Sequence, residues 1–339
     1  FIYGIDALND VTSQPLVDGR KWVPEMDMEN LAGFFQSKWV YNDDLIIKAG
    51  IRREEIDLAV DDYSTLKLCV SADTCSIPLD VTGDTLNYRA TTYNLGIRYN
   101  IMASFQPFAN YSQGADISDI GRLLRTATVT DISLIQTQAS IIDNYEIGFI
   151  SDIDNLHFEF SAYRSTSELG TTNEYDPNTG VYLPVRAPQE IYGYEALAHY
   201  KFNSELNVTA TYAWVEGKDT ANDIYLGAQQ ISAPKGTINI NWQPMDNANV
   251  AVTYLYVGDR KKFDQVDGQY VGDKGPVDSY HIVNLSGSYN LSDDWSGFIG
   301  IENLFNQDYF PAKSQAYTYN GYNVKGLGTT VNMGINYQF

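Results

Sequence analysis

Basic residues are scarce in this chain of 339 residues. It contains 22 Lys and Arg against 43 Asp and Glu, so its formal net charge is 22 − 43 = −21. A protein that binds nucleic acid or an anionic membrane surface needs a basic face to neutralise phosphates. The charge balance therefore argues against nucleic acid as a partner and against peripheral docking on anionic lipid.

Long apolar runs, cysteines and histidines are also rare. No stretch of about 18 consecutive apolar residues exists, so no transmembrane helix is expected. His157, His199 and His281 lie in separate predicted strands without metal-ligand spacing, so we expect no metal site. No serine has the context of a nucleophile elbow, and we expect neither a catalytic residue nor an enzyme. Phe1 begins the chain without a signal peptide, which predicts a mature product or a fragment.

Tyrosine and glycine, by contrast, are abundant at 26 each. Aromatic and β-branched residues fit a pleated surface, so this composition predicts an all-β fold. Apolar residues take every second position from Val331 to Phe339, and 206–214, 236–242 and 283–289 alternate in the same way. Soluble sandwiches and transmembrane barrels both alternate, so both classes remain open at this point.

Three further features favour a transmembrane antiparallel β-barrel. Aromatic residues lie near the ends of the apolar faces, as in the girdles of a lipid-facing barrel. The polar faces hold Asn, Thr, Ser and Gly, which suit a wet lumen. Tight turns at 41–44, 100–101, 153–155, 203–205, 244–247 and 291–294 alternate with connections of about 18 to 31 residues, typical of an outer-membrane barrel. About fourteen strands are predicted, near 1–8, 28–40, 45–56, 86–99, 102–111, 143–152, 156–165, 190–202, 206–216, 235–243, 248–257, 279–290, 295–303 and 329–339.

Short stretches along the chain share their order with the motifs of one family. They are 1–6 (FIYGID), 18–24 (DGRKWVP), 49–52 (AGIR), 110–114 (NYSQG), 119–125 (DIGRLLR), 144–148 (NYEIG), 186–195 (RAPQEIYGYE), 301–306 (IENLFN) and 337–339 (YQF). Together they resemble the TonB-dependent outer-membrane receptors, in particular the ferric siderophore branch with hydroxamate- and aerobactin-type ligands. Ala115 departs from the pattern, where the family has an aromatic residue.

The resemblance implies a bacterial outer-membrane receptor that imports a ferric siderophore with energy from the TonB complex. The family has an N-terminal plug inside a barrel of about 22 strands, so residues 1–339 are expected to be the C-terminal part of such a barrel, without the plug. Outer-membrane lipid and, through the missing N-terminal region, the TonB complex are the implied partners. Iron is expected only within the siderophore, with no resident cofactor. The alternative function is that of a passive outer-membrane pore of about fourteen strands, through which small or apolar solutes diffuse without energy coupling. A soluble β-domain is the third possibility.

The two cysteines, Cys69 and Cys75, fall in the long predicted loop 57–85. An outer-membrane protein has crossed the oxidising periplasm, so we expect them to form a disulfide. Two free thiols are the alternative. Asp57, Asp61 and Asp62 in the same region match no calcium-loop spacing.

Cations and aromatic residues in the predicted loops are the candidate ligand-binding residues. Guanidinium groups and phenol rings suit a bulky, anionic ferric siderophore with flat apolar edges. The alternative is that these side chains only pack the loops against one another. The candidates are Trp22, Arg122, Arg125, Tyr175, Tyr182, Arg186, Tyr225, Tyr317, Tyr319 and Tyr322.

Overall fold

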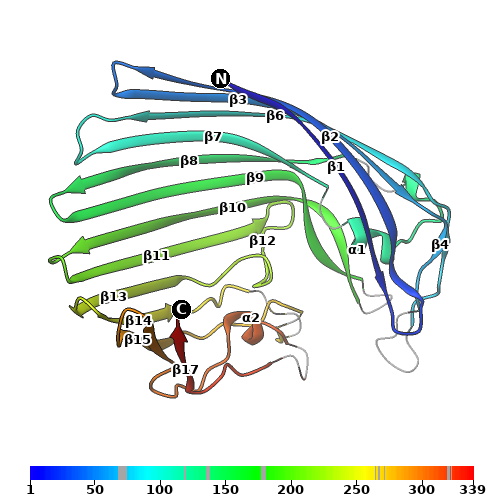
Figure 1. Ribbon diagram of the computed structural model, residues 1–339. Coiled ribbons are helices and arrows are strands. Elements are labelled where there is room, and N and C mark those ends of the chain that lie inside the picture. The colour runs from blue at the N-terminus through cyan, green and yellow to red at the C-terminus, as the bar shows by residue number, and fades with distance from the viewer. Residues whose placement is uncertain are drawn as a thin grey trace.

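The computed structural model describes residues 1–339 except 68–74, 118–119, 135–137, 177–180, 264, 266–267, 271, 319–320 and 322, and it describes only the backbone of 171–176 and 181–186. The described chain is dominated by one curved antiparallel sheet (Figure 1). Fourteen strands follow one another along it in chain order. They are β1 (Ile2–Pro15), β2 (Lys21–Tyr41), β3 (Leu45–Val60), β6 (Asp84–Tyr99), β7 (Gln106–Asp116), β8 (Ser140–Ile153), β9 (Leu156–Asp176), β10 (Val181–Lys201), β11 (Leu206–Asp219), β13 (Lys235–Met245), β14 (Ala248–Val257), β15 (Tyr280–Asn290), β16 (Trp295–Glu302) and β17 (Thr330–Tyr337).

The predicted number and order of the main strands are confirmed. The sheet is not closed: among the described residues β1 and β17 form its two edges. Three very short strands stand apart from the main path. β4 (Tyr63–Ser64) pairs with β5 (Asp80–Val81), and β12 (Ile224–Tyr225) pairs with the end of β11.

Every second residue along the strands points to the same face, and the two faces differ in composition. One face is apolar: a cross-strand row runs through Val208, Ile240, Val252 and Leu285. The opposite face carries Thr209, Asn239, Thr253 and Asn284 at the neighbouring positions. An apolar outer band over a polar interior is the pattern of a membrane barrel. We refer to these two faces as the apolar face and the polar face.

Short and long connections alternate along the chain, and the short ones lie together at one end of the sheet, as predicted. Six turns of two to six residues gather there, on the left of Figure 1. Asn42, Asp43 and Asp154 adopt left-handed backbone in these turns, with φ of 50°, 60° and 48°, a conformation that Asn and Asp tolerate well. The turn predicted at 100–101 is longer, because β7 begins only at Gln106. In the barrels of this class the short turns mark the periplasmic end.

Two of the long loops predicted at the opposite end are wrong. Residues 9–27 form mostly strand, and only 16–20 connect β1 to β2, with Gly19 at φ 87° in the turn. Residues 166–189 likewise belong mostly to β9 and β10, whose register continues from Tyr200↔Leu156 to Val181↔Asp176. Backbone hydrogen bonds between paired strands do not depend on side-chain polarity. A hairpin can therefore extend beyond the apolar band with a polar sequence that resembles a loop.

Two of the remaining long connections carry short helical segments among their described residues. α1 (Ile120–Arg125) and η1 (Ile132–Leu134) lie between β7 and β8, and α2 (Ala312–Gln315) lies between β16 and β17. No helix in the described part of the chain is both long and apolar enough to cross a membrane.

Candidate ligand-binding site

A hydrophobic cluster joins two of the long connections to the polar face of β2, β3 and β6. Leu58 and Leu86 pair across β3 and β6, and Leu124 of α1 and Ile132 of η1 cover them. Both Leu124 and Ile132 are 0% exposed. Burying a side chain of this size stabilises the fold by about 1.5–3 kcal/mol. The described residues of connection 117–139 therefore pack against the sheet, inside the curve of the strands near α1 (Figure 1). They form one wall at the end of the sheet that carries the long connections, and we call this end the mouth.

Trp22 and Arg125 meet at the edge of this wall. The guanidinium carbon of Arg125 lies 4.9 Å from the centre of the Trp22 ring, within the range of a cation–π interaction. Tyr63 anchors the same helix, because its hydroxyl donates to the Leu124 carbonyl at 2.8 Å, and burial raises the pKa of Tyr63 to about 12. Arg122 lies one turn earlier on α1 and is half-buried. The structure thus brings together Trp22 and Arg125, two predicted residues from widely separated motifs, 18–24 and 119–125.

A second cluster forms the opposite wall. Connections 220–234, 258–279 and 303–329 share a core of Ala228, Ala233, Val257, Val277 and Ala316. A buried ion pair fastens it: Arg260 pairs with Glu216 and also donates to the Leu226 carbonyl at 2.6 Å. Both charged side chains are at most 3% exposed.

Tyr225 belongs to the second wall and is remote in the fold from Trp22. The ammonium groups of Lys218 and Lys262 lie 4.6 and 5.5 Å from the centre of its ring. Tyr317 follows α2 and is half-buried beside buried Ala316. These contacts agree with the alternative interpretation, in which loop aromatics pack the loops together.

A pocket of about 410 Å³ opens on the polar face of β7–β10, in the half nearer the long connections. Four of its ten lining residues carry hydroxyls, Ser140, Ser165, Thr166 and Ser167, and Ile142 and Ile191 lie among them. The Oγ atoms of Ser140 and Ser167 lie 2.7 Å apart, and Ser165 Oγ donates to Asn144 Oδ1 at 2.6 Å. Gln230 of the second wall and Asp116 of β7 complete the lining. One hydroxyl of the Ser140–Ser167 pair does not donate to its partner, so the pocket can offer a hydrogen bond to a ligand oxygen.

The sequence analysis missed this pocket. Its serines occupy every second position, at 165 and 167, opposite Asn144 and Ile142 of β8. Alternation alone would have placed them on the polar face. Their meeting with Ser140 and Gln230 depends on strand register and on the fold of a distant connection.

Several predicted residues cannot be placed as side chains. Tyr175, Tyr182 and Arg186 lie on the paired backbones of β9 and β10 rather than in a loop, with Tyr182 opposite Tyr175. Tyr319 and Tyr322 lie outside the described residues. Cys69 also lies outside them, so the Cys69–Cys75 disulfide stays a prediction.

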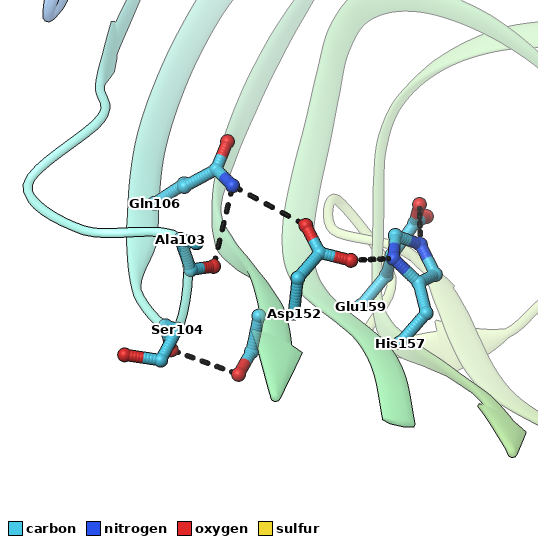
Figure 2. A network of polar contacts seen from close by, with 7 residues as sticks. Ala103, Ser104, Gln106, Asp152, His157 and Glu159 are labelled. Atoms are coloured by element: carbon cyan, nitrogen blue, oxygen red, sulfur yellow. Dashed lines mark hydrogen bonds and ion pairs between the residues drawn. The ribbon is translucent and has the colours of Figure 1, made fainter. Parts of the chain in front are cut away.

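Two of the histidines, His157 and His199, hold strands together at the end with the short turns. His157 lies between two carboxylates, with Nδ1 2.6 Å from Asp152 and Nε2 2.8 Å from Glu159 (Figure 2). Asp152 also accepts from Gln106 at 3.4 Å, and this ties the β6–β7 turn to the β8–β9 hairpin. His199 faces His157 across β9 and β10, and its Nδ1 lies 2.9 Å from Thr209 Oγ1. Among the described residues, no group of three His, Cys, Asp or Glu side chains has the geometry of a metal site.

Comparison with known proteins identifies the family. Residues 3–304 match the family described as TonB dependent receptor-like, beta-barrel. The chain belongs to this family. Membership confirms the predicted barrel fold and places the receptor in the bacterial outer membrane. It also argues against a soluble β-domain.

Relatives and solved structures agree with this assignment. A ferric aerobactin receptor of Klebsiella pneumoniae is 27% identical to the receptor over 348 residues, covering 93% of this chain and 44% of the relative. A ferric aerobactin receptor of Escherichia coli is 28% identical over 349 residues, with coverage of 93% and 44%. The solved copper transporter OprC has a TM-score of 0.79 at 15% identity, covering 99% of this chain and 54% of that one, which shows a shared fold. The chain spans less than half the length of the curated relatives.

Proposed function

We propose that the receptor binds a ferric siderophore at the outer mouth, between its two walls, and imports it with energy from the TonB complex. Support for the substrate class comes from the relatives, which are ferric aerobactin receptors. Because the chain spans 44% of those relatives, the plug and the contact with TonB are proposed to belong to the remainder of the protein. Residues 1–339 would then form one unit, the C-terminal part of the barrel.

The pocket of β7–β10, with its serine hydroxyls beside the two packed walls, is the observation that carries the proposal. A ferric siderophore presents oxygen atoms and, in the aerobactin class, negative charge. The hydroxyl of the Ser140–Ser167 pair that does not donate to its partner would donate to one of those oxygens, while Arg122 and Arg125 on α1 would supply positive charge at the mouth. Iron would travel within the ligand, so we propose neither a resident metal nor a catalytic step.

The family favours this receptor over a passive pore. TonB dependent receptor-like barrels are receptors and transporters, whereas no feature of the described residues specifically favours passive diffusion. A passive pore would also have no use for a specific pocket.

Binding measurements with the complete receptor test the proposal. Replacing Arg122 or Arg125 by Ala should weaken binding of a ferric citrate–hydroxamate siderophore by about 1.5–3 kcal/mol, the range for hydrogen bonds to charged groups. That equals roughly ten- to hundredfold in affinity, and the loss should shrink as salt rises. Arg20→Ala is the matched control, since Arg20 is an exposed cation on the β1–β2 turn that pairs with Asp18.

A second variant separates the arginines from the pocket. Ser167→Leu fills the pocket with an apolar side chain and should abolish binding while leaving α1 untouched. If only Ser167→Leu lowers affinity, the arginines serve the packing of α1 and the pocket alone binds the ligand. Unchanged affinity and uptake in all three variants would contradict the proposed site.

A further inference from the structure

A second pocket, of about 380 Å³, lies on the polar face of β2, β3 and β6 to β8, toward the end with the short turns. It follows one cross-strand row, Lys38–Lys48–Gly96–Asn110–Glu146. Gly96 has no side chain and leaves a hollow between its neighbours; a Cβ atom there would meet Asn110 Oδ1 at 3.3 Å. The volume falls within the range of about 300–1,000 Å³ typical of ligand pockets. This pocket is separate from the pocket of β7–β10, which lies toward the mouth.

Three cations line this second pocket without a counter-charge. Lys38 and Lys48 are exposed and lie directly opposite each other on β2 and β3, and like charges in that position destabilise a strand pair. Arg98 lies on β6, two residues beyond Gly96, and its Nε atom is buried without a hydrogen-bond partner among the described residues. None of the three cations forms an ion pair with any residue that the structure describes.

Charge complementarity therefore selects an anion as the occupant. Glu146 lines the far edge of the second pocket, but three strand spacings of about 4.8 Å separate its Cα from that of Lys48, roughly 14 Å along the row. A carboxylate placed in the hollow over Gly96 would accept charge-assisted hydrogen bonds from the two ammonium groups and from the Arg98 guanidinium. A neutral ligand would leave the repulsion between Lys38 and Lys48 uncompensated.

We propose that the second pocket is a transit site for the ferric siderophore, which it binds through a carboxylate after the ligand has left the mouth. This inference rests on the proposed function. A ligand that enters at the mouth and leaves at the end with the short turns moves along the polar face, and the second pocket lies on that path. The negative charge of the aerobactin class is what the three cations fit.

Zero-length coupling on the purified, complete receptor tests the transit site directly. A water-soluble carbodiimide joins a carboxylate to a lysine amino group in contact with it, and peptide mass spectrometry finds the modified lysine. With ferric aerobactin as the probe, we expect the mass of the ligand on Lys38 or Lys48 at least fivefold more often than on Lys201. Lys201 is the matched control, because it is exposed on the polar face near the short turns but does not line the pocket.

Two variants separate the charge of the second pocket from its shape. Arg98→Gln removes one cation and should lower coupling at both lysines at least fivefold. Gly96→Leu keeps all three cations but fills the hollow, and it should lower coupling to the same extent. Heat-modifiable migration in gels checks that each variant is folded.

Uptake by cells that carry the complete receptor separates the transit site from the mouth. The double variant Lys38→Gln, Lys48→Gln should keep the Kd of ferric aerobactin at the cell surface within twofold and lower the maximal uptake rate at least fivefold, whereas Lys201→Gln should change neither. Unchanged uptake in the double variant would overturn the transit site, as would equal coupling in Arg98→Gln and wild type.

Coupling without ligand tests the other source of a carboxylate. If Lys38 or Lys48 then joins an acidic residue of the receptor itself, the second pocket is filled by the protein and the transit site is overturned. Absence of any binding of ferric aerobactin to the wild type would instead overturn the proposed function, and the transit site with it.

Discussion

Replacing Val252 by Arg tests the assignment of the two faces most directly. Val252 lies midway along β14 on the apolar face, between Ile240 of β13 and Leu285 of β15. A guanidinium there would have to enter the hydrocarbon layer. An arginine on the lipid face near the midplane costs about 2–4 kcal/mol in a membrane barrel. Equilibrium unfolding of the complete receptor from phospholipid vesicles in guanidinium, followed by tryptophan fluorescence, measures this cost.

Two alanines on the same strand are matched controls. Ala251 faces the polar side between Asn241 and Ser286, so Ala251→Arg should cost less than about 1 kcal/mol, because the guanidinium stays hydrated. Ala248 lies on the apolar face at the start of β14, and Ala248→Arg should cost about 0–1 kcal/mol near the interface. Equal costs for Val252→Arg and Ala251→Arg would refute the assignment of faces.

The loop walls and the cysteines give the remaining predictions. Leu124→Ala should destabilise the first wall by about 2–5 kcal/mol, so limited proteolysis of 117–139 should accelerate while the strand content measured by circular dichroism is unchanged; unchanged proteolysis would show that α1 does not depend on this core. Glu216→Gln should cost about 3–5 kcal/mol in thermal unfolding, because Arg260 remains buried without its counter-charge, and joint replacement of both by apolar residues should cost less. Cys69 and Cys75 should resist alkylation until reduced, and prompt labelling of the native, unreduced receptor would show free thiols.

Alternation and turn chemistry determined most of the sheet. The face of residues such as Met333 and Asn332 follows from a side-chain period of two, and tight turns place the strands that they join side by side; both are local properties. Tight turns were recognisable because Asn and Asp tolerate the left-handed backbone found at Asn42 and Asp154. These features depend on neighbours in the sequence, so the sequence alone predicts them.

The ends of the strands were less predictable, because side-chain composition favours a loop for the same residues that backbone pairing keeps in a strand. The polar stretches 9–15 and 166–176 resemble loops by composition, yet they remain paired in β1 and β9. Pairing is decided by the partner strand, which supplies the backbone hydrogen bonds whatever the side chains are. Composition therefore indicated where the apolar band ends rather than where the strand ends.

The ligand site depended almost entirely on tertiary structure. The sequence selected Trp22 and Arg125 as separate candidates, but only the packing of α1 on β2 brings the guanidinium to 4.9 Å from the ring centre. The serine pocket requires the register of β7 to β10 together with Gln230 from a distant connection. Side chains more than a hundred residues apart meet through the curvature of the whole sheet, and no local pattern encodes that curvature.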